Sequence, residues 1–258
     1  MRDSLFRLLP LLGEVSRRAC GVTEGAERIR RGGGWPPPPS FGWSPSPKRG
    51  RRHPVTPAEF QTLHAATPAQ MADLVTLIER LTAANAVMNL VGPDTIPDVW
   101  NRHIHDSAQL LDLAPEAATW SDLGAGAGFP GLVLAILLKD RADSHVWLID
   151  SLGKRCRFLQ EVVDALSLRA TVINGRAEDQ RITADVVTAR ALAPMERLLG
   201  YAQPYLQRGA QGLFLKGEKA EVELIEARKV WHFDSSLSVS RSDPRGRIVS
   251  VRSLRRAR

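Results

Sequence analysis

Apolar and polar positions begin to alternate in a regular way at Thr56. Thr67-Pro68-Ala69-Gln70 combines a capping box with proline at the first helical position. Apolar residues then recur with the spacing of one helical face, at Met71, Leu74, Val75, Ile78 and Leu81. The pattern predicts a helix here and a second helix over about 97–113, so we expect residues 55–115 to form a small helical part.

From Thr119 onward, short apolar runs alternate with stretches of helical periodicity. The apolar runs are 119–123, 145–149, 171–174, 186–189 and 212–216, and the helical stretches are about 130–139, 154–166, 194–206 and 218–229. Alternation of this kind predicts an α/β fold with a mostly parallel sheet that helices cover on both faces. Residues 231–239 and 247–251 are expected to pair antiparallel at the sheet edge, within a domain spanning 116–258.

The first 54 residues have a different composition. Glycine and proline make up 16 of them, which is typical of a disordered segment. An apolar stretch near the start is interrupted by Arg7 and Pro10 and has no convincing cleavage site, so we do not expect a secretory signal. We expect residues 1–54 to be a disordered basic leader, and one hypothesis is that translation of the native protein starts at Val55.

The formal charge of +7 suggests nucleic acid as a partner, but the charge is unevenly distributed. Residues 1–54 hold 11 Lys/Arg and 4 Asp/Glu, residues 55–240 hold 17 and 23, and residues 241–258 hold 7 and 1. The middle of the chain is therefore acidic, and net charge alone identifies no partner for it. The arginines of the C-terminal tail are expected to add salt-dependent attraction to RNA.

Two classes of protein are excluded by simple counts. The chain has two cysteines, too few for a disulfide framework or a cysteine zinc site. No uncharged apolar stretch reaches about 18 residues, which excludes a transmembrane helix.

The most informative segment for ligand binding is Asp122-Leu123-Gly124-Ala125-Gly126-Ala127-Gly128-Phe129-Pro130-Gly131. Glycines at 124, 126 and 128 let the backbone turn sharply after a strand and come close to a ligand. The same segment satisfies the dinucleotide fingerprint G-x-G-x-x-G. However, Pro130 removes a backbone donor that a pyrophosphate needs, and Asp122 would repel the phosphates.

Strand, acid and G-x-G-x-G together resemble the first motif of class I S-adenosylmethionine-dependent methyltransferases. The resemblance implies that Asp122 faces the amino-acid part of the cofactor. Asp150 ends the next strand and could accept both ribose hydroxyls, which dinucleotide folds also use. These residues favour a methyltransferase over a dehydrogenase, but they do not exclude a dehydrogenase.

Further motifs resemble one methyltransferase family closely, the RsmG or glucose-inhibited division protein B family of 16S ribosomal RNA 7-methylguanosine methyltransferases. They are Asn89-Leu90, Arg102-His103-Ile104-His105-Asp106-Ser107, the glycine loop, the run from Asp150 to Leu159, Arg176-Ala177-Glu178, Thr188-Ala189-Arg190-Ala191 and Phe214-Leu215-Lys216-Gly217. Together they cover about residues 56–252. The chain departs from the family pattern at Ala84 and Val91, both in the helical part.

The resemblance implies a set of site residues. Gly124 and Phe129 would line the cofactor pocket together with Gly126 and Gly128, Ala177 and Glu178 would meet the adenine, and Arg190 would lie between cofactor and RNA. The implied cofactor is S-adenosylmethionine, and the implied partner is 16S ribosomal RNA or the small ribosomal subunit. We expect a cytoplasmic monomer without membrane association.

Methylation at guanine N7 makes few demands on the protein, because that atom carries no proton at neutral pH. Alignment of the sulfonium methyl with N7 suffices, so we assign no catalytic base. Cys156, inside a predicted helix, is expected to have no chemical role.

Several polar residues allow a functional and a structural interpretation. His103 and Asp106 lie one helical turn apart, so they could form a polar pair at the active-site mouth or a hydrogen bond that fixes the helical part. His103 and His105 point to opposite sides of a helix, which disfavours a metal site. Lys154, Arg155 and Arg157 are expected to contact RNA phosphate rather than form only a solvated face. Lys216 could face the pocket or solvent.

Three alternatives remain beside guanine N7 methylation of 16S ribosomal RNA. They are a methyltransferase for another RNA, a protein or a small molecule, an NAD-dependent dehydrogenase, and a non-catalytic RNA-binding assembly factor.

Overall fold

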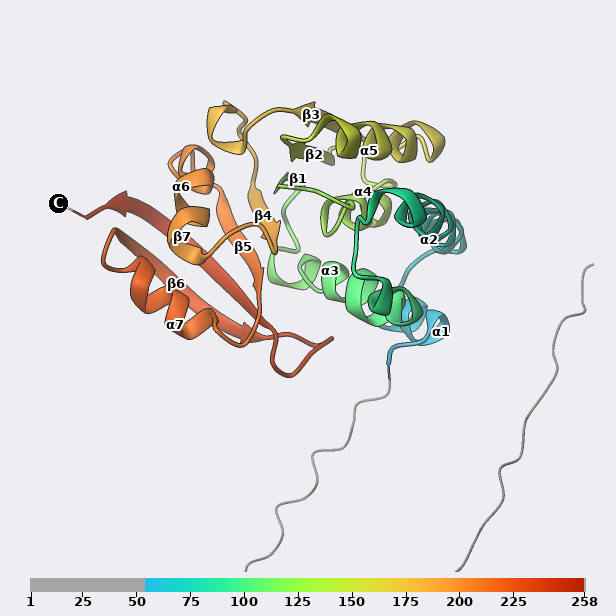
Figure 1. Cartoon of the computed structure of the whole chain (residues 1–258), viewed down its shortest axis with the longest axis horizontal. Coiled ribbons are helices and arrows are strands. Elements are labelled where there is room, and N and C mark those ends of the chain that lie inside the picture. The colour runs from blue at the N-terminus through green and yellow to red at the C-terminus, as the bar shows by residue number, and fades with distance from the viewer. Residues whose placement is uncertain (1–53, 258) are drawn as a thin grey trace, which may run out of the picture. The chain divides into compact units, whose positions relative to one another are not determined.

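A seven-stranded, mostly parallel sheet forms the centre of the chain in a computed structural model, which describes residues 54–257 (Figure 1). The leader expected over 1–54 lies outside the described residues apart from Pro54, so its disorder and the hypothesis of a start at Val55 stay untested. Among the described residues, no helix is both long and apolar enough to cross a membrane.

The order of the strands places the site. The strands are β1 (Thr119–Leu123), β2 (His145–Asp150), β3 (Ala170–Asn174), β4 (Val186–Arg190), β5 (Gln211–Lys216), β6 (Trp231–Val239) and β7 (Arg247–Arg256). They lie in the order β3-β2-β1-β4-β5-β7-β6. Strands β1 to β5 are parallel, whereas β7 pairs antiparallel with both β5 and β6, which confirms the predicted antiparallel edge. The order reverses between β1 and β4, and such a switch point opens a crevice at the carboxyl ends of the strands.

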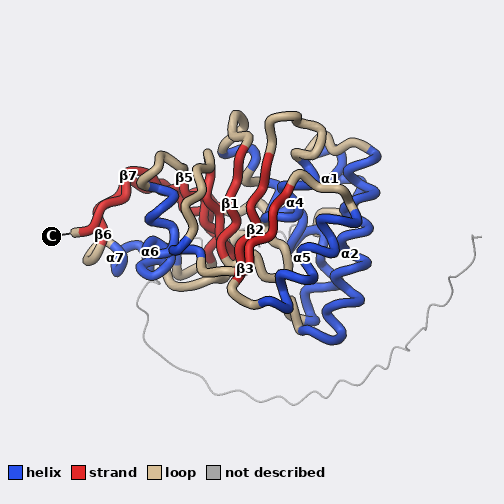
Figure 2. The backbone as a smooth tube through the Cα atoms, turned by 90° about the horizontal axis from the view of Figure 1, so that it is seen from above, coloured by secondary structure: helices blue, strands red, loops and turns tan. Residues whose placement is uncertain are grey.

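Helices cover the two faces of this sheet in separate groups (Figure 2). They are α4 (Gly131–Leu137), α5 (Gly153–Ala165), α6 (Met195–Leu206) and α7 (Ala220–Ala227), each close to its predicted stretch. Alternate strand residues point to opposite faces. Trp120 and Leu148 accordingly join a core with α4 and α5, whereas Ile149 and Phe214 join a core with α6 and α7.

The helical part before β1 packs on the first of these cores. It begins with α1 (Pro57–Leu63) and α2 (Pro68–Met88), and Thr56 and Thr67 each form a capping box at a helix start. Leu74, Leu77 and Leu81 are fully buried, while Val75 is 44% exposed, so the buried face of α2 is rotated from the predicted one. The helical part therefore shares its hydrophobic core with the sheet and does not fold around a core of its own.

The predicted second helix over 97–113 is wrong as a single helix. Residues 93–113 contain η1 (Pro93–Asp98, a 3₁₀-helix), η2 (Trp100–His105, a π-helix), α3 (Asp106–Ala108) and η3 (Leu111–Leu113). Prolines at 93 and 97 favour the short first turn because they have no backbone N–H to donate. A π-turn inserts an extra residue and changes the direction of side chains, and such turns often occur at functional sites. His103 lies in this turn.

Candidate functional site

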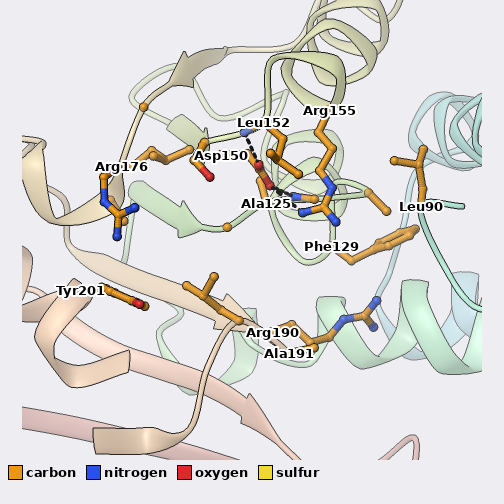
Figure 3. A pocket seen from close by; sticks show the side chains of 18 of the residues that line it. Leu90, Ala125, Phe129, Asp150, Leu152, Arg155, Arg176, Arg190, Ala191 and Tyr201 are labelled. Carbon is orange, nitrogen blue, oxygen red and sulfur yellow. Dashed lines mark hydrogen bonds and ion pairs between the residues drawn. The ribbon is translucent and has the colours of Figure 1, made fainter. Parts of the chain in front are cut away.

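A cavity of about 560 Å³ opens at the carboxyl ends of β1, β2 and β4, where the strand order reverses (Figure 3). Residues from the glycine loop, from the end of β2, from the segment after β3 and from the end of β4 line it. These include, among the predicted residues, Gly124, Gly126, Phe129, Asp150, Arg155, Ala177, Glu178 and Arg190. We call it the first cavity.

The glycine loop adopts the backbone conformation that its sequence predicts. Gly124, Gly126 and Gly128 all have positive φ, at 67°, 57° and 91°. A Cβ atom on Gly126 would meet nothing nearer than the Gly124 carbonyl oxygen at 3.6 Å, whereas one on Gly128 would lie 2.2 Å from Leu132 Cδ1. The absence of a side chain at Gly126 therefore leaves space in the cavity, and the absence of one at Gly128 permits close packing on α4. Gly128 itself is not part of the cavity lining.

Asp122 supports the loop from behind, in a different position from the predicted cofactor contact. It is 1% exposed and is absent from the cavity lining. Gly131 N donates to its Oδ2 at 2.9 Å, and the Thr188 hydroxyl donates to its Oδ1 at 3.1 Å. Burial raises the pKa of Asp122 to about 7. Through these two hydrogen bonds, Asp122 of β1 is linked to the start of α4 and to β4.

This arrangement bears on the dinucleotide alternative. The amide of Gly131, at the first turn of α4, already donates to Asp122. A pyrophosphate at the helix N-terminus would need such free amides, and it would meet the Asp122 carboxyl behind them. The local geometry thus disfavours dinucleotide binding.

Asp150 lies at the end of β2 and lines the first cavity. Gly126 N donates to Oδ2 at 3.0 Å and Leu152 N donates to Oδ1 at 2.8 Å, while Arg155 pairs with Oδ2 at 3.5 Å (Figure 3). A carboxylate has about four acceptor positions and three are in use, so one further donor such as a ribose hydroxyl can still bind. Asp150 therefore couples the glycine loop to the cofactor side of the cavity.

Ala177 and Glu178, in the short helix η4 (Ala177–Asp179), form another part of the lining of the first cavity. The buried Tyr205 hydroxyl donates to the Ala177 carbonyl at 2.9 Å and fixes η4 to α6. Glu178 accepts from Arg176 Nε at 2.7 Å. Arg176, Arg197 and Tyr201 also line this part, and sequence reasoning did not single out the last two.

Arg190 occupies the centre of a polar cluster at the end of β4. Its guanidinium contacts His103 Nδ1 at 2.6 Å, donates to the Arg102 carbonyl at 3.0 Å and lies 5.2 Å from the Phe129 ring centroid. The His103 ring stacks on Phe129 with centroids 4.8 Å apart. Burial, with the charges of Arg190 and Arg102, lowers the pKa of His103 to about 3. A neutral imidazole that accepts at Nδ1 carries its proton on Nε2, which is 2.8 Å from the Thr95 hydroxyl.

Asp106 joins the helical part to the β6–β7 hairpin. Its Oδ1 accepts hydrogen bonds from Gln109, Ser240 and Ser242, and its Oδ2 pairs with Arg190 at 3.5 Å. His103 and Asp106 were predicted to meet directly or to fix the helical part. Arg190 stands between them, so the two interpretations merge in one network.

A second cavity, of about 640 Å³, adjoins the first. Leu90, Val91, Arg190 and Ala191 line both cavities. His103, Asp106 and Lys216 line only the second one. Lys216 is 9% exposed and pairs with Glu223 at 2.6 Å, so it faces this cavity rather than solvent. In the sequence, the motif Phe214-Leu215-Lys216-Gly217 was the feature that pointed to this part of the second cavity.

The predicted RNA-contacting cations of α5 fall in different places. Arg155 lines the first cavity, whereas Lys154 and Arg157 do not line either cavity. Cys156 between them is buried, and its thiol donates to the Asp150 carbonyl at 3.2 Å. His105 contacts His64 at 2.9 Å, away from His103.

The chain is similar to proteins of one methyltransferase family. The family model described as rRNA small subunit methyltransferase G matches residues 70–245. Ribosomal RNA small subunit methyltransferase G of Caulobacter vibrioides strain NA1000 is 59% identical over 201 residues, covering 78% of this chain and 93% of that protein. The same protein of Methylorubrum populi is 47% identical over 191 residues, covering 73% and 90%.

A solved structure, cofactor-bound Rv0187 from MTB, is similar in fold. Its TM-score is 0.52 at 16% identity, and the similarity covers 78% of this chain and 98% of that one.

Proposed function

We propose a function from one premise: this chain belongs to the rRNA small subunit methyltransferase G family. It is an S-adenosylmethionine-dependent rRNA methyltransferase with the class I fold, which confirms the predicted family, fold and cofactor. The specific reaction that we propose is methyl transfer to N7 of a guanine in 16S ribosomal RNA.

The observation that carries the proposal is the shared wall between the two cavities. The first cavity offers groups that suit a nucleoside cofactor: a glycine loop with no side chain at Gly126, a carboxylate at Asp150, and the backbone of Ala177 and Glu178. The second cavity meets it at Arg190 and Ala191. A methyl donor in one and an acceptor in the other can therefore come into contact.

The residues at this wall suit alkylation of an unprotonated ring nitrogen. The bound cofactor supplies an electrophilic sulfonium methyl, and guanine N7 supplies a free lone pair. No proton has to leave before transfer, so the chain needs to hold the reactants at near-attack distance. The neutral His103 ring and the engaged Arg190 guanidinium serve as a rigid boundary and not as a proton acceptor.

The proposed cofactor contacts are those of the first cavity. Asp150 would accept a ribose hydroxyl, Ala177 and Glu178 would meet the adenine, and Phe129 would pack on an apolar part of the ligand. Asp122 and Gly128 would act indirectly by shaping the loop. Arg155 is the α5 cation in position to reach ligand or RNA phosphate.

We propose that a monomer carries out the reaction. We place it in the cytoplasm, where bacterial ribosomal RNA is found.

The test is methyl transfer from labelled S-adenosylmethionine to small ribosomal subunits and to free 16S RNA. We expect a single 7-methylguanosine, located by nucleoside mass analysis and by chemical cleavage at the modified base. Asp150→Ala should abolish transfer, while Asp234→Asn, an exposed change on β6, should leave it intact. Methylation of another atom, or of protein in the subunit, would contradict the proposal.

A further inference from the structure

The second cavity contains nine charged side chains, and most of them neutralise one another. The paired cations are Arg190, Lys216, Arg245 and Arg247, and the paired acids are Asp106, Glu223 and Asp243. Among the described residues, two charged lining side chains have no ion-pair or hydrogen-bond partner, Arg102 and Glu218. Both are exposed.

Arg102 stands beside another cation. Its carbonyl accepts from Arg190, and its charge helps to lower the pKa values of Arg190 and His103. The side chains of Arg102 and Arg190 both line the second cavity. Like charges in one cavity repel each other, and an anion near them would relieve the repulsion. This end of the second cavity therefore suits a phosphate.

Glu218 lies two residues after Lys216, which ends β5, and its side chain carries a carboxylate. An ionised carboxylate is an acceptor with two oxygens, and it binds best to two adjacent donors. Guanine has such a pair on its Watson–Crick edge, the N1–H and the N2 amino group. Adenine has no ring N–H there, and hypoxanthine lacks the amino group.

We propose that the second cavity binds the target guanine nucleotide, with Glu218 reading the N1–H and N2 amino group and Arg102 contacting its phosphate. The assignment rests on the proposed function. Guanine N7 lies on the opposite edge from N1 and N2. Glu218 lines the second cavity and not the first. In the proposed orientation, N7 points away from Glu218 and toward the wall shared with the first cavity.

A base must leave its helix or loop to enter such a cavity, as is general for enzymes that modify bases. The space of about 640 Å³ is sufficient for a nucleotide. Leu90 and Val91, which line both cavities, provide apolar surface against which the base can pack.

Nucleotide binding tests the proposal directly. Calorimetry is carried out with the full chain saturated with S-adenosylhomocysteine, and guanosine, GMP, IMP and AMP are the probes. The wild type should bind GMP more tightly than IMP and AMP, by about tenfold, because the site's carboxylate loses a donor with each analogue. Glu218→Gln should reduce the preference for GMP over IMP to near one.

Arg102→Gln should remove the advantage of GMP over guanosine and leave the preference over IMP unchanged. Matched controls are Arg80→Gln and Glu79→Gln, exposed residues of α2 outside both cavities, and both should behave as wild type. Gly217→Leu adds a bulky side chain to the lining of the second cavity. A Cβ at Gly217 has no atom within 4 Å, so this variant should fold and bind S-adenosylhomocysteine normally but lose GMP.

Unchanged GMP binding by Gly217→Leu, an intact GMP-over-IMP preference in Glu218→Gln, or no GMP binding by wild type at millimolar concentration would each overturn the proposal. The same variants are assayed for rRNA methylation. Normal methylation by wild type and all three variants would reject the guanine cavity and keep the proposed function. The expected nucleotide preferences without any rRNA methylation by wild type would reject the function and keep the cavity.

Discussion

Replacing Asp122 tests whether this carboxyl group supports the glycine loop or contacts the cofactor. Asparagine keeps one acceptor for the Gly131 amide and places its amino group against the Thr188 hydroxyl oxygen. Alanine leaves the buried Gly131 N–H, now 2.9 Å from Asp122 Oδ2, without an acceptor. We therefore expect Asp122→Ala to lower the free energy of unfolding by about 1–3 kcal/mol, the usual cost of a buried unsatisfied group.

The pH dependence separates the effect of charge from that of hydrogen bonding. Burial raises the pKa of Asp122 from 3.8 to about 7 in the folded chain. The folded state thus holds a proton that the unfolded state releases, and stability falls as pH rises between about 4 and about 7. Asparagine has no proton to lose, so Asp122→Asn should gain about 2–3 kcal/mol relative to wild type between pH 5 and pH 8.

Urea unfolding of wild type and both variants at pH 5 and pH 8 measures this difference. The comparison must be relative, because burial lowers the pKa values of His64 and His103 to about 4 and about 3 and makes the wild type lose stability as pH falls below about 6.5. Calorimetry with S-adenosylmethionine completes the test. If folded Asp122→Asn loses more than tenfold in cofactor affinity, the carboxylate contacts the cofactor, and our interpretation of its position is refuted.

Three further predictions concern neighbouring residues. Gly128→Ala should lower the free energy of unfolding by about 2–3 kcal/mol, because Gly128 has positive φ and its new Cβ would lie 2.2 Å from Leu132. Gly126→Ala should lower it by about 1 kcal/mol, because φ is positive there too, and should also weaken cofactor binding. Since the pKa of His103 is about 3, an NMR titration should show no change of its ring protons from pH 5 to pH 8, and a step in that range would contradict the neutral imidazole. Tyr205→Phe should lower the free energy of unfolding by about 1 kcal/mol through loss of the bond to Ala177, and equal urea midpoints would show that this bond adds no stability.

The sheet could be predicted from the sequence because each strand is a short apolar run between polar turns. The predicted ranges 119–123, 186–189 and 231–239 differ from β1, β4 and β6 by at most one residue. The glycine loop was also predictable, because three alternating glycines directly after a strand favour a sharp turn with positive φ. The segment 93–113 was not, because its periodicity resembles a helix while its path depends on contacts with distant residues such as Arg190 and Ser240.

Asp122 shows a different limit of sequence reasoning. An acid two residues before a glycine loop can point along the strand to a ligand or turn back to the helix that follows. The choice depends on Gly131, where a Cβ would lie 2.7 Å from Asp122 Oδ2, and on Thr188 of the neighbouring strand. Neither contact can be inferred from spacing along the chain, because β1 and β4 are 66 residues apart at that hydrogen bond.

The helical part has a role beyond covering the sheet. It supplies Arg102, His103 and Asp106, and all three contact Arg190 at the end of β4. Arg190 in turn forms part of the wall between the two cavities. A class I sheet with its glycine loop can hold a cofactor. The second cavity is lined in addition by residues of the helical part and of the β6–β7 hairpin, which hydrogen bonds to Asp106 join. Loss of packing between α2 and α4 should therefore reach substrate binding before cofactor binding, since Asp150 and Gly126 bond to each other without the helical part.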